Sequence, residues 1–201
     1  MAASPPRLER VTRSDLPVLS GVLARAFLDD PVAEWAFRAD KLRLKALERF
    51  QGTRMKQLIP EQEVWTDQER RCAALWAPPG RWKMSLAEVA AMVPAFAHPR
   101  LIGRMPIAAI GWEKLEQRHP HDPPHWYLAV LGTDPSAQGQ GLGSAVMRPV
   151  LERCDTDGVG AYLESSKESN IAFYSRHGFQ VTEEIRLVSG PPMWKMWRDP
   201  R

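Results

Sequence analysis

The stretch Asp134-Pro-Ser-Ala-Gln-Gly-Gln-Gly-Leu-Gly-Ser144 places three glycines between two regular segments. Before it, Trp126–Thr133 is a largely apolar run, typical of a strand buried on both faces. After it, the hydrophobic pattern from Leu142 to Cys154 predicts a helix. Glycines permit positive φ angles and close approach of a ligand, and the N–H groups at the start of a helix attract anions. The stretch therefore predicts a binding loop for a diphosphate.

Two familiar diphosphate loops fit this stretch poorly. A P-loop needs a Lys after its glycines, and none follows here. A dinucleotide-binding turn would use Gly139, Gly141 and Ser144, with Glu164 as the acidic residue about 20 positions further on. In such a turn the strand runs straight into the first glycine, whereas Asp134–Gln138 intervene here. Only about 60 residues remain after the loop, too few for the further βα units of that fold.

A third kind of loop fits throughout. Gln138-x-x-Gly141-x-Gly143 matches the [Q/R]xxGxG/A loop of the GNAT acetyltransferases. Leu131-Gly-Thr-Asp-Pro135 is similar to the strand end and V-x-P that precede the loop in that family. Asn170-Ile-Ala-Phe-Tyr-Ser-Arg-His-Gly-Phe179 resembles the family's N-x-x-A-x-x-x-Y-x-x-x-G-F region, with a shorter spacing from Asn170 to the tyrosine than in many members. Residues 125–144 and 162–179 also resemble puromycin N-acetyltransferase-like proteins, while residues 1–120 match only loosely.

The resemblance implies an α/β fold of GNAT type. Its sheet would be mixed and mostly antiparallel, splayed at the acetyl-CoA strand, with helices on both faces. We expect one domain over residues 1–201, with a helical insertion at about 85–118 that opens with the capping box Ser85-Leu-Ala-Glu. Periodicity and turn signals predict further strands at 8–12, 63–66, 72–76, 161–164, 181–188 and 193–197, and further helices at 16–27, 32–58 (divided at Gly52), 85–97, 101–117 and 170–177.

The resemblance also implies a reaction. An acetyl group would pass from acetyl-CoA to a primary amine of a small molecule by direct attack, without an acyl-enzyme. The resemblance to puromycin N-acetyltransferase-like proteins suggests an aminonucleoside-like antibiotic as the amine. Two alternatives stay open: a protein acetyltransferase that acts on a lysine or an N-terminal amine, and an acetyl-CoA-binding module without catalysis.

Carried over position by position, the resemblance predicts the residues of the site. The pantetheine arm would lie along the end of the cofactor strand, and the diphosphate on the N–H groups of the glycine loop. Tyr174 is the expected general acid, because a phenol can protonate a leaving thiolate. The residues expected to bind acetyl-CoA are Leu131, Gly132, Thr133, Gln138, Gly139, Gln140, Gly141, Leu142, Gly143, Ser144, Asn170 and Tyr174.

The acceptor side is less determined. Glu164 is the candidate base, acting directly or through water, but it could equally pair with a basic residue or with the substrate ammonium. Asn170 has a second interpretation as the N-cap of the helix that carries Tyr174. Asp29 and Asp30 lie where this family often lines its acceptor site, or they simply end a helix.

Histidines and tryptophans add weaker expectations. His125 stands among prolines and is expected to be solvated, and His177 is expected to interact electrostatically with the end of its helix. Most of the eight tryptophans should lie in the core, with one or two from the N-terminal half walling an apolar acceptor pocket.

Composition excludes several classes of protein. The net charge of +3 is too small for a nucleic-acid-binding surface. No apolar run is long enough for a signal peptide or a membrane span, so we expect no membrane partner and a cytoplasmic location. Cys72 and Cys154 show no metal-ligand spacing, so no metal site is predicted and both should be reduced core thiols. The family resemblance allows a homodimer, but the sequence indicates no interface.

Overall fold

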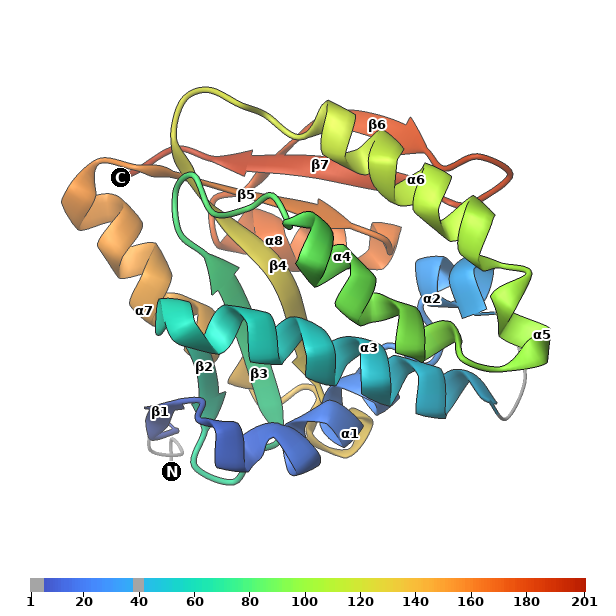
Figure 1. Cartoon of the computed structure of the whole chain (residues 1–201). Helices are drawn as coiled ribbons and strands as arrows, with labels where there is room; N and C mark the ends of the chain where they lie inside the picture. Colours follow the sequence, from blue (N-terminus) through green and yellow to red (C-terminus); the bar gives the residue numbers. More distant parts are fainter. Residues whose placement is uncertain (1–5, 38–41) are drawn as a thin grey trace.

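A seven-stranded sheet with helices on both faces organises the chain, as a computed structural model describes it for residues 6–37 and 42–201 (Figure 1). The strand order is β1-β2-β3-β4-β5-β7-β6, and every neighbouring pair is antiparallel except β4 and β5. The strands are β1 (Leu8–Arg10), β2 (Val64–Asp67), β3 (Cys72–Ala77), β4 (His125–Thr133), β5 (Gly160–Ser165), β6 (Gln180–Arg186) and β7 (Pro192–Arg198). The predicted mixed, mostly antiparallel sheet is confirmed.

The helices bury their apolar faces against this sheet. On one face, α1 and α3 share a core with β3 and β4 that contains Leu19, Met55 and Leu75. On the other face, α7 and α8 share a core with β3, β4 and β5 that contains Trp76, Met147 and Tyr174. The helices are α1 (Leu16–Ala26), α2 (Pro31–Phe37), α3 (Leu42–Leu58), α4 (Leu86–Met92), α5 (Pro99–Ile102), α6 (Met105–Arg118), α7 (Leu142–Asp157) and α8 (Ile171–Arg176).

The sheet opens between its two parallel strands. β4 and β5 pair only from His125 opposite Gly160 to Tyr127 opposite Tyr162, and they part beyond this point. On the other edge of β4, Leu75 of β3 lies opposite Val130 while Trp76 lies opposite Leu128, so Ala129 is an extra residue in β4. Such a β-bulge bends its strand and increases the local twist. The predicted splay at this strand is therefore present, and the bulge supplies its cause.

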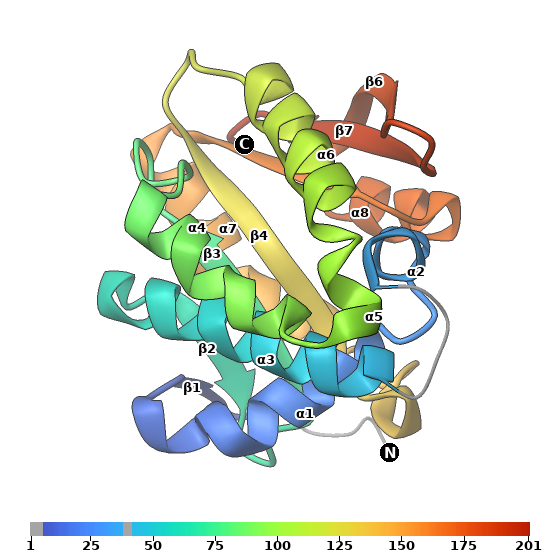
Figure 2. The same ribbon diagram turned by 45° about the vertical axis from the view of Figure 1, so that its right-hand side comes forward.

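The segment between β3 and β4 is largely helical and contains α4, α5 and α6. α4 and α6 flank the line of β4 on the same side of the sheet (Figure 2). The capping box forms as predicted, with the Ser85 backbone N–H donating to Glu88 and the Glu88 N–H donating to Ser85 Oγ. The first helix of the insertion ends at Met92 rather than at residue 97, and a 3-10 turn over Val93–Phe96 follows. Pro94 explains the early end, because it has no N–H for a helical hydrogen bond.

Two further predictions about elements need correction. The helical pattern at 32–58 forms two helices, α2 and α3, and residues 38–41 between them lie outside the described part of the chain. Gly52 does not divide α3. A Cβ there would lie 2.6 Å from Ser20 Oγ of α1, so the glycine allows α1 and α3 to pack closely instead.

The strand β4 is not buried on both faces. Most of its residues alternate between buried and partly exposed, because β5 leaves its C-terminal half.

Both cysteines are buried and free, as expected for core thiols. Burial raises the pKa of Cys72 and of Cys154 to about 12, so both stay protonated at neutral pH. No helix among the described residues is long and apolar enough to cross a membrane.

Gly132 fixes the distance between β4 and α1. A Cβ at this position would lie 2.7 Å from Leu23 Cδ2 and 3.1 Å from Ala26 Cβ, inside normal contact distance. We expect Gly132→Ala to lower the free energy of unfolding by about 1–3 kcal/mol through overpacking, measured by urea denaturation. Gly103→Ala is the control, because a Cβ at Gly103 meets no heavy atom within 4 Å. Equal free energies of unfolding for the two variants would show that α1 can move away from β4 without loss of stability.

Candidate functional site

The glycine loop joins the open end of β4 to α7. Gly139 and Gly141 have φ angles of +75° and +77°, which residues with a Cβ rarely adopt. A Cβ at either position would meet no heavy atom within 4 Å, so the backbone conformation, rather than crowding, calls for glycine. Gly143 differs, because its Cβ would lie 3.3 Å from the Phe173 ring of α8. The third glycine therefore lets α7 and α8 approach each other.

The start of α7 presents unpaired hydrogen-bond donors. Gly141 is the N-cap residue, and its carbonyl accepts the N–H of Ala145 at 3.0 Å. Within the described part of the chain, no protein group accepts the N–H of Gly141, Leu142, Gly143 or Ser144. Four adjacent donors at the positive end of a 16-residue helix favour an anion. The predicted diphosphate loop thus has the donors that such a ligand needs.

Side chains hold this loop in place. Gln138 Nε2 donates to the carbonyl of Thr133 at 3.3 Å, closing the loop onto the end of β4. Arg25 of α1 donates to Asp134 at 2.6 Å and Arg71 donates to Gln140 Oε1 at 3.4 Å. Neither arginine was predicted from the sequence, because both contacts join positions far apart in the chain.

His177 belongs to the same region. Its Nε2 lies 2.9 Å from Ser144 Oγ, and burial lowers its pKa, so the ring is neutral at neutral pH. The prediction that His177 interacts electrostatically with its helix end is therefore wrong: the residue links α8 to the first turn of α7.

Asn170 occupies the N-cap position of α8, but its side chain makes no capping hydrogen bond, so the capping interpretation is also wrong.

Tyr174 lies on α8 in the core that α7 shares with the sheet. Its ring is buried, and among the described residues its hydroxyl has no hydrogen-bond partner. Burial, and then the negative charge of Asp30, raise the pKa of Tyr174 above its ordinary value near 10. The phenol therefore stays protonated at neutral and mildly alkaline pH, as a proton donor must.

Asp30 and Asp29 anchor the turn between α1 and α2 to the segment after β5. Asp30 is buried; it accepts the N–H groups of Val32 and Ala33 and the hydroxyl of Ser166. Burial raises the pKa of Asp30, whereas the Lys167 ammonium 2.6 Å from Asp29 lowers the pKa of that carboxyl. The two residues lie in the turn between α1 and α2, where Asp30 accepts N–H groups from the first turn of α2, and the turn also brings its charge near Tyr174.

Glu164 occupies the opposite face of β5 from α8. Its neighbours Ala161 and Leu163 belong to the core with α7, so Tyr162 and Glu164 point to the other side. Burial is the largest cause that raises the pKa of Tyr127 and of Tyr162, and the negative charge of Glu164 is the second largest. Its Oε1 lies 3.6 Å from His119 Nδ1, and both side chains are almost fully buried. Glu164 thus has a histidine beside it, and this contact becomes an ion pair only when the ring is protonated.

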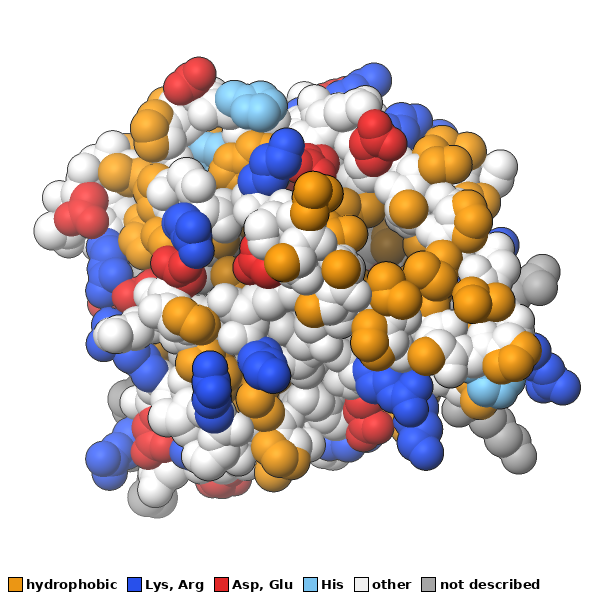
Figure 3. Space-filling view, in the orientation of Figure 1, with side chains coloured by type: hydrophobic (Ala, Val, Ile, Leu, Met, Phe, Trp, Pro, Cys, Tyr) orange, Lys and Arg blue, Asp and Glu red, His pale blue; other side chains and the backbone are white. Residues whose placement is uncertain are grey.

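A cavity of about 30 Å³ adjoins Glu164 beneath α6. Trp82, from the N-terminal half, and Trp112 of α6 take part in its wall, and the Trp82 ring stacks on His119 with centroids 3.9 Å apart. Figure 3 shows hydrophobic side chains around a hollow between α4 and α6 on this face. The lining residues are Trp82, Lys83, Met84, Trp112, Leu115, Glu116, His119, Tyr127 and Glu164.

His125 is placed differently from its prediction. It is the first residue of β4 and is 2 % exposed, because it pairs opposite Gly160 inside the sheet. Its Nδ1 lies 2.8 Å from the Pro123 carbonyl, and its Nε2 lies 3.0 Å from His119 Nε2. Burial lowers the pKa of His125. The expectation that His125 is solvated is therefore wrong, and its contact with His119 forms across a proline-rich turn.

Comparisons with known proteins agree with this geometry. A model of the acetyltransferase (GNAT) family matches residues 53–179, more than half of the chain. The mycothiol acetyltransferase of Rhodococcus jostii is 31 % identical over 126 residues, which cover 60 % of this chain and 37 % of that protein. The chain spans well under half the length of the curated relatives that it matches.

Solved structures share the fold over almost the whole chain. A structure described as histone acetyltransferase HPA2 and related acetyltransferase, from Corynebacterium glutamicum, has a TM-score of 0.67 at 24 % identity and covers 98 % of both chains. The polyamine N-acetyltransferase of Drosophila melanogaster, whose description states that it forms N-acetylagmatine, has a TM-score of 0.61 at 16 % identity. It covers 96 % of this chain and 99 % of that one.

Proposed function

Because this chain belongs to the GNAT family of acetyltransferases, we propose that it transfers an acetyl group from acetyl-CoA to a primary amine of a small molecule. The observation that carries the proposal is the set of unpaired N–H groups at Gly141–Ser144, at the start of α7 and next to the splayed end of β4. An anionic ligand would pair those donors, and the parting of β4 from β5 leaves β4 backbone groups without a neighbouring strand.

The residues present suit acetyl-CoA. Gly139–Ser144 would hold its diphosphate through backbone N–H groups at the positive end of α7. Leu131, Gly132 and Thr133 would hydrogen-bond its pantetheine arm, because β5 does not pair with this part of β4. When bound, acetyl-CoA supplies the activated thioester whose acetyl group the amine takes.

Proton transfers fall to two residues on opposite faces of the sheet. Tyr174, kept protonated by burial, donates from its hydroxyl to the leaving sulfur. Glu164 draws the substrate ammonium toward the cavity and receives its proton. Asn170, whose side chain does not cap α8, is available to bind acetyl-CoA. The backbone N–H groups near Leu131 polarise the reacting carbonyl.

The acceptor side favours a small amine over a protein. The cavity beside Glu164 has a volume of about 30 Å³, which is room for an ammonium group alone, and Trp82 and Trp112 form part of its wall. Lys83 pairs with Glu116 at 2.8 Å, so Glu164 is the lining carboxylate that would meet the ammonium. This combination suits an ammonium carried on an apolar or aromatic body. The resemblance of 125–144 and 162–179 to puromycin N-acetyltransferase-like proteins adds an aminonucleoside-like antibiotic to the candidates. We take residues 1–201 as one catalytic domain in which the insertion at about 85–118 supplies much of this wall.

An amine panel tests the proposal. Release of the CoA thiol is followed with acetyl-CoA and, one at a time, tryptamine, agmatine, puromycin and a lysine-containing peptide. We expect turnover with at least one small primary amine and a far lower kcat/KM with the peptide. Turnover of the peptide alone would establish a protein acetyltransferase. Tight binding of acetyl-CoA without turnover of any amine would favour the non-catalytic module.

A further inference from the structure

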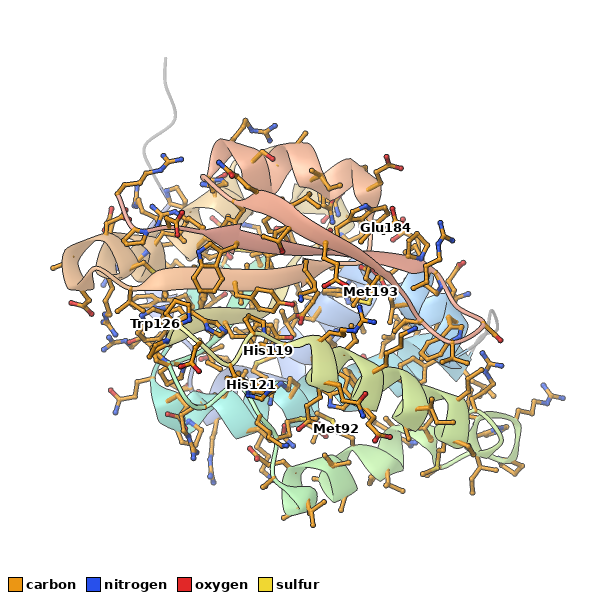
Figure 4. All side chains as sticks on the ribbon, turned by 90° about the horizontal axis from the view of Figure 1, so that it is seen from above. Met92, His119, His121, Trp126, Glu184 and Met193 are labelled. Atoms are coloured by element: carbon orange, nitrogen blue, oxygen red, sulfur yellow. The ribbon has the colours of Figure 1, made fainter. Side chains whose placement is uncertain are left out.

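The mechanism so far leaves the buried pair His119 and His125 without a role. His119 follows the end of α6, where the chain turns back toward the sheet (Figure 4). It is 4 % exposed, lines the same cavity as Glu164, and stacks on Trp82. A buried titratable group beside a substrate cavity is costly unless its hydrogen bonds are satisfied. The partners of this pair therefore define what it can do.

The hydrogen bonds of the pair specify a tautomer for each ring. The Pro123 carbonyl can only accept, so His125 Nδ1 carries the hydrogen in their 2.8 Å contact. Neutral His125 then has a bare Nε2, which must accept from His119 Nε2–H across 3.0 Å. Neutral His119 is left with a bare Nδ1. That nitrogen is the one that lies 3.6 Å from Glu164 Oε1.

From this arrangement we propose that His119 Nδ1 is the final acceptor of the substrate proton, and that His125 and the Pro123 carbonyl are positioning groups that keep this nitrogen free. The inference rests on the proposed function. In the step, an N–H bond of the substrate ammonium breaks toward Glu164, and the proton moves on to form an Nδ1–H bond. The amine keeps the electron pair and becomes a nucleophile, and no oxidant or further reactant is needed.

The geometry favours the transfer from carboxylate to imidazole, because the bare Nδ1 of His119 faces Glu164 Oε1. The resulting cation stays paired with the Glu164 carboxylate, which offsets the cost of a buried charge. The titratable and charged groups around His119 are His125 and Tyr127 of β4, Tyr162 and Glu164 of β5, and Lys83 and Glu116 at the cavity.

His119→Gln tests the proposal with little change of shape. The glutamine amide replaces the Nε2–H donor toward His125 but has no basic nitrogen. We expect kcat/KM for the best amine of the panel to fall about 100-fold at pH 7, with unchanged affinity for CoA. The pH profile of wild-type kcat/KM should contain an ionisation that the variant lacks, because a glutamine amide has no basic nitrogen to accept a proton.

His98→Gln is the matched control, because His98 begins α5 and does not line this cavity. It should keep the wild-type rate and pH profile. A His119→Gln enzyme with the wild-type rate and pH profile would overturn the role of His119 alone, whereas a wild-type protein that acetylates no amine would overturn the proposed function.

A second readout is independent of activity. Nitrogen-15 NMR of histidine-labelled protein, assigned with the variants, should give the Nε2–H tautomer for neutral His119 and the Nδ1–H tautomer for His125. The reverse tautomers would place a hydrogen on His119 Nδ1 and exclude it as the proton acceptor.

Discussion

Tyr174→Phe is expected to lower kcat by about 10- to 100-fold while the affinity for CoA stays at its wild-type value. The variant removes only the hydroxyl, which is the one group of Tyr174 that can donate a proton. Burial raises the pKa of this phenol, so the wild-type hydroxyl is protonated at neutral pH and able to donate. The measurement is steady-state kinetics with the best amine, together with calorimetric titration of CoA.

The same variant supplies its own structural control. Among the described residues, nothing hydrogen-bonds to the Tyr174 hydroxyl, so its removal leaves no buried partner unsatisfied. The midpoint of urea unfolding should therefore change little. An unchanged kcat in a stable variant would remove Tyr174 from the path of the proton.

Gly141→Ala is expected to weaken CoA binding by at least about 10-fold, the largest binding effect we predict for one methyl group. Gly141 has a φ of +77° and caps the start of α7, where the unpaired N–H groups lie. An alanine disfavours this backbone conformation, by about 1 kcal/mol or more, and shifts the N–H groups that would hold the diphosphate. Calorimetry with CoA measures the change.

The opposite end of the same helix provides the control. Gly158 ends α7 with a φ of +66°, and a Cβ there, as at Gly141, would meet no heavy atom within 4 Å. Gly158→Ala should lose a similar amount of stability and keep its affinity for CoA. If both variants bound CoA equally well, the start of α7 would not be the diphosphate site.

Local patterns were sufficient to predict several elements of this fold. The glycine loop, α7 and the capping box of α4 each depend on residues within a few positions of one another, and each was predicted close to its observed bounds. The splay of β4 came from the family resemblance. Its structural cause, the extra residue Ala129, depends on pairing with β3 and has no signal in the sequence of β4 itself.

The acceptor side depended on contacts between distant segments. His119, His125 and Glu164 meet because α6 returns over the parallel pair of strands, an arrangement that no local pattern encodes. His125 was expected in solvent because prolines surround it, yet pairing opposite Gly160 buries it. Arg25 and Arg71 were missed for the same reason. Both lie far from the loop in the sequence, and they contact it through Asp134 and Gln140.

The most direct test of the central claim is calorimetric titration of the protein with acetyl-CoA, with NADH titrated in parallel. We predict one acetyl-CoA bound for each chain and no binding of NADH, because the loop at Gln138–Ser144 follows the GNAT pattern rather than that of a dinucleotide-binding turn. Binding of NADH without binding of acetyl-CoA would contradict the account at its foundation.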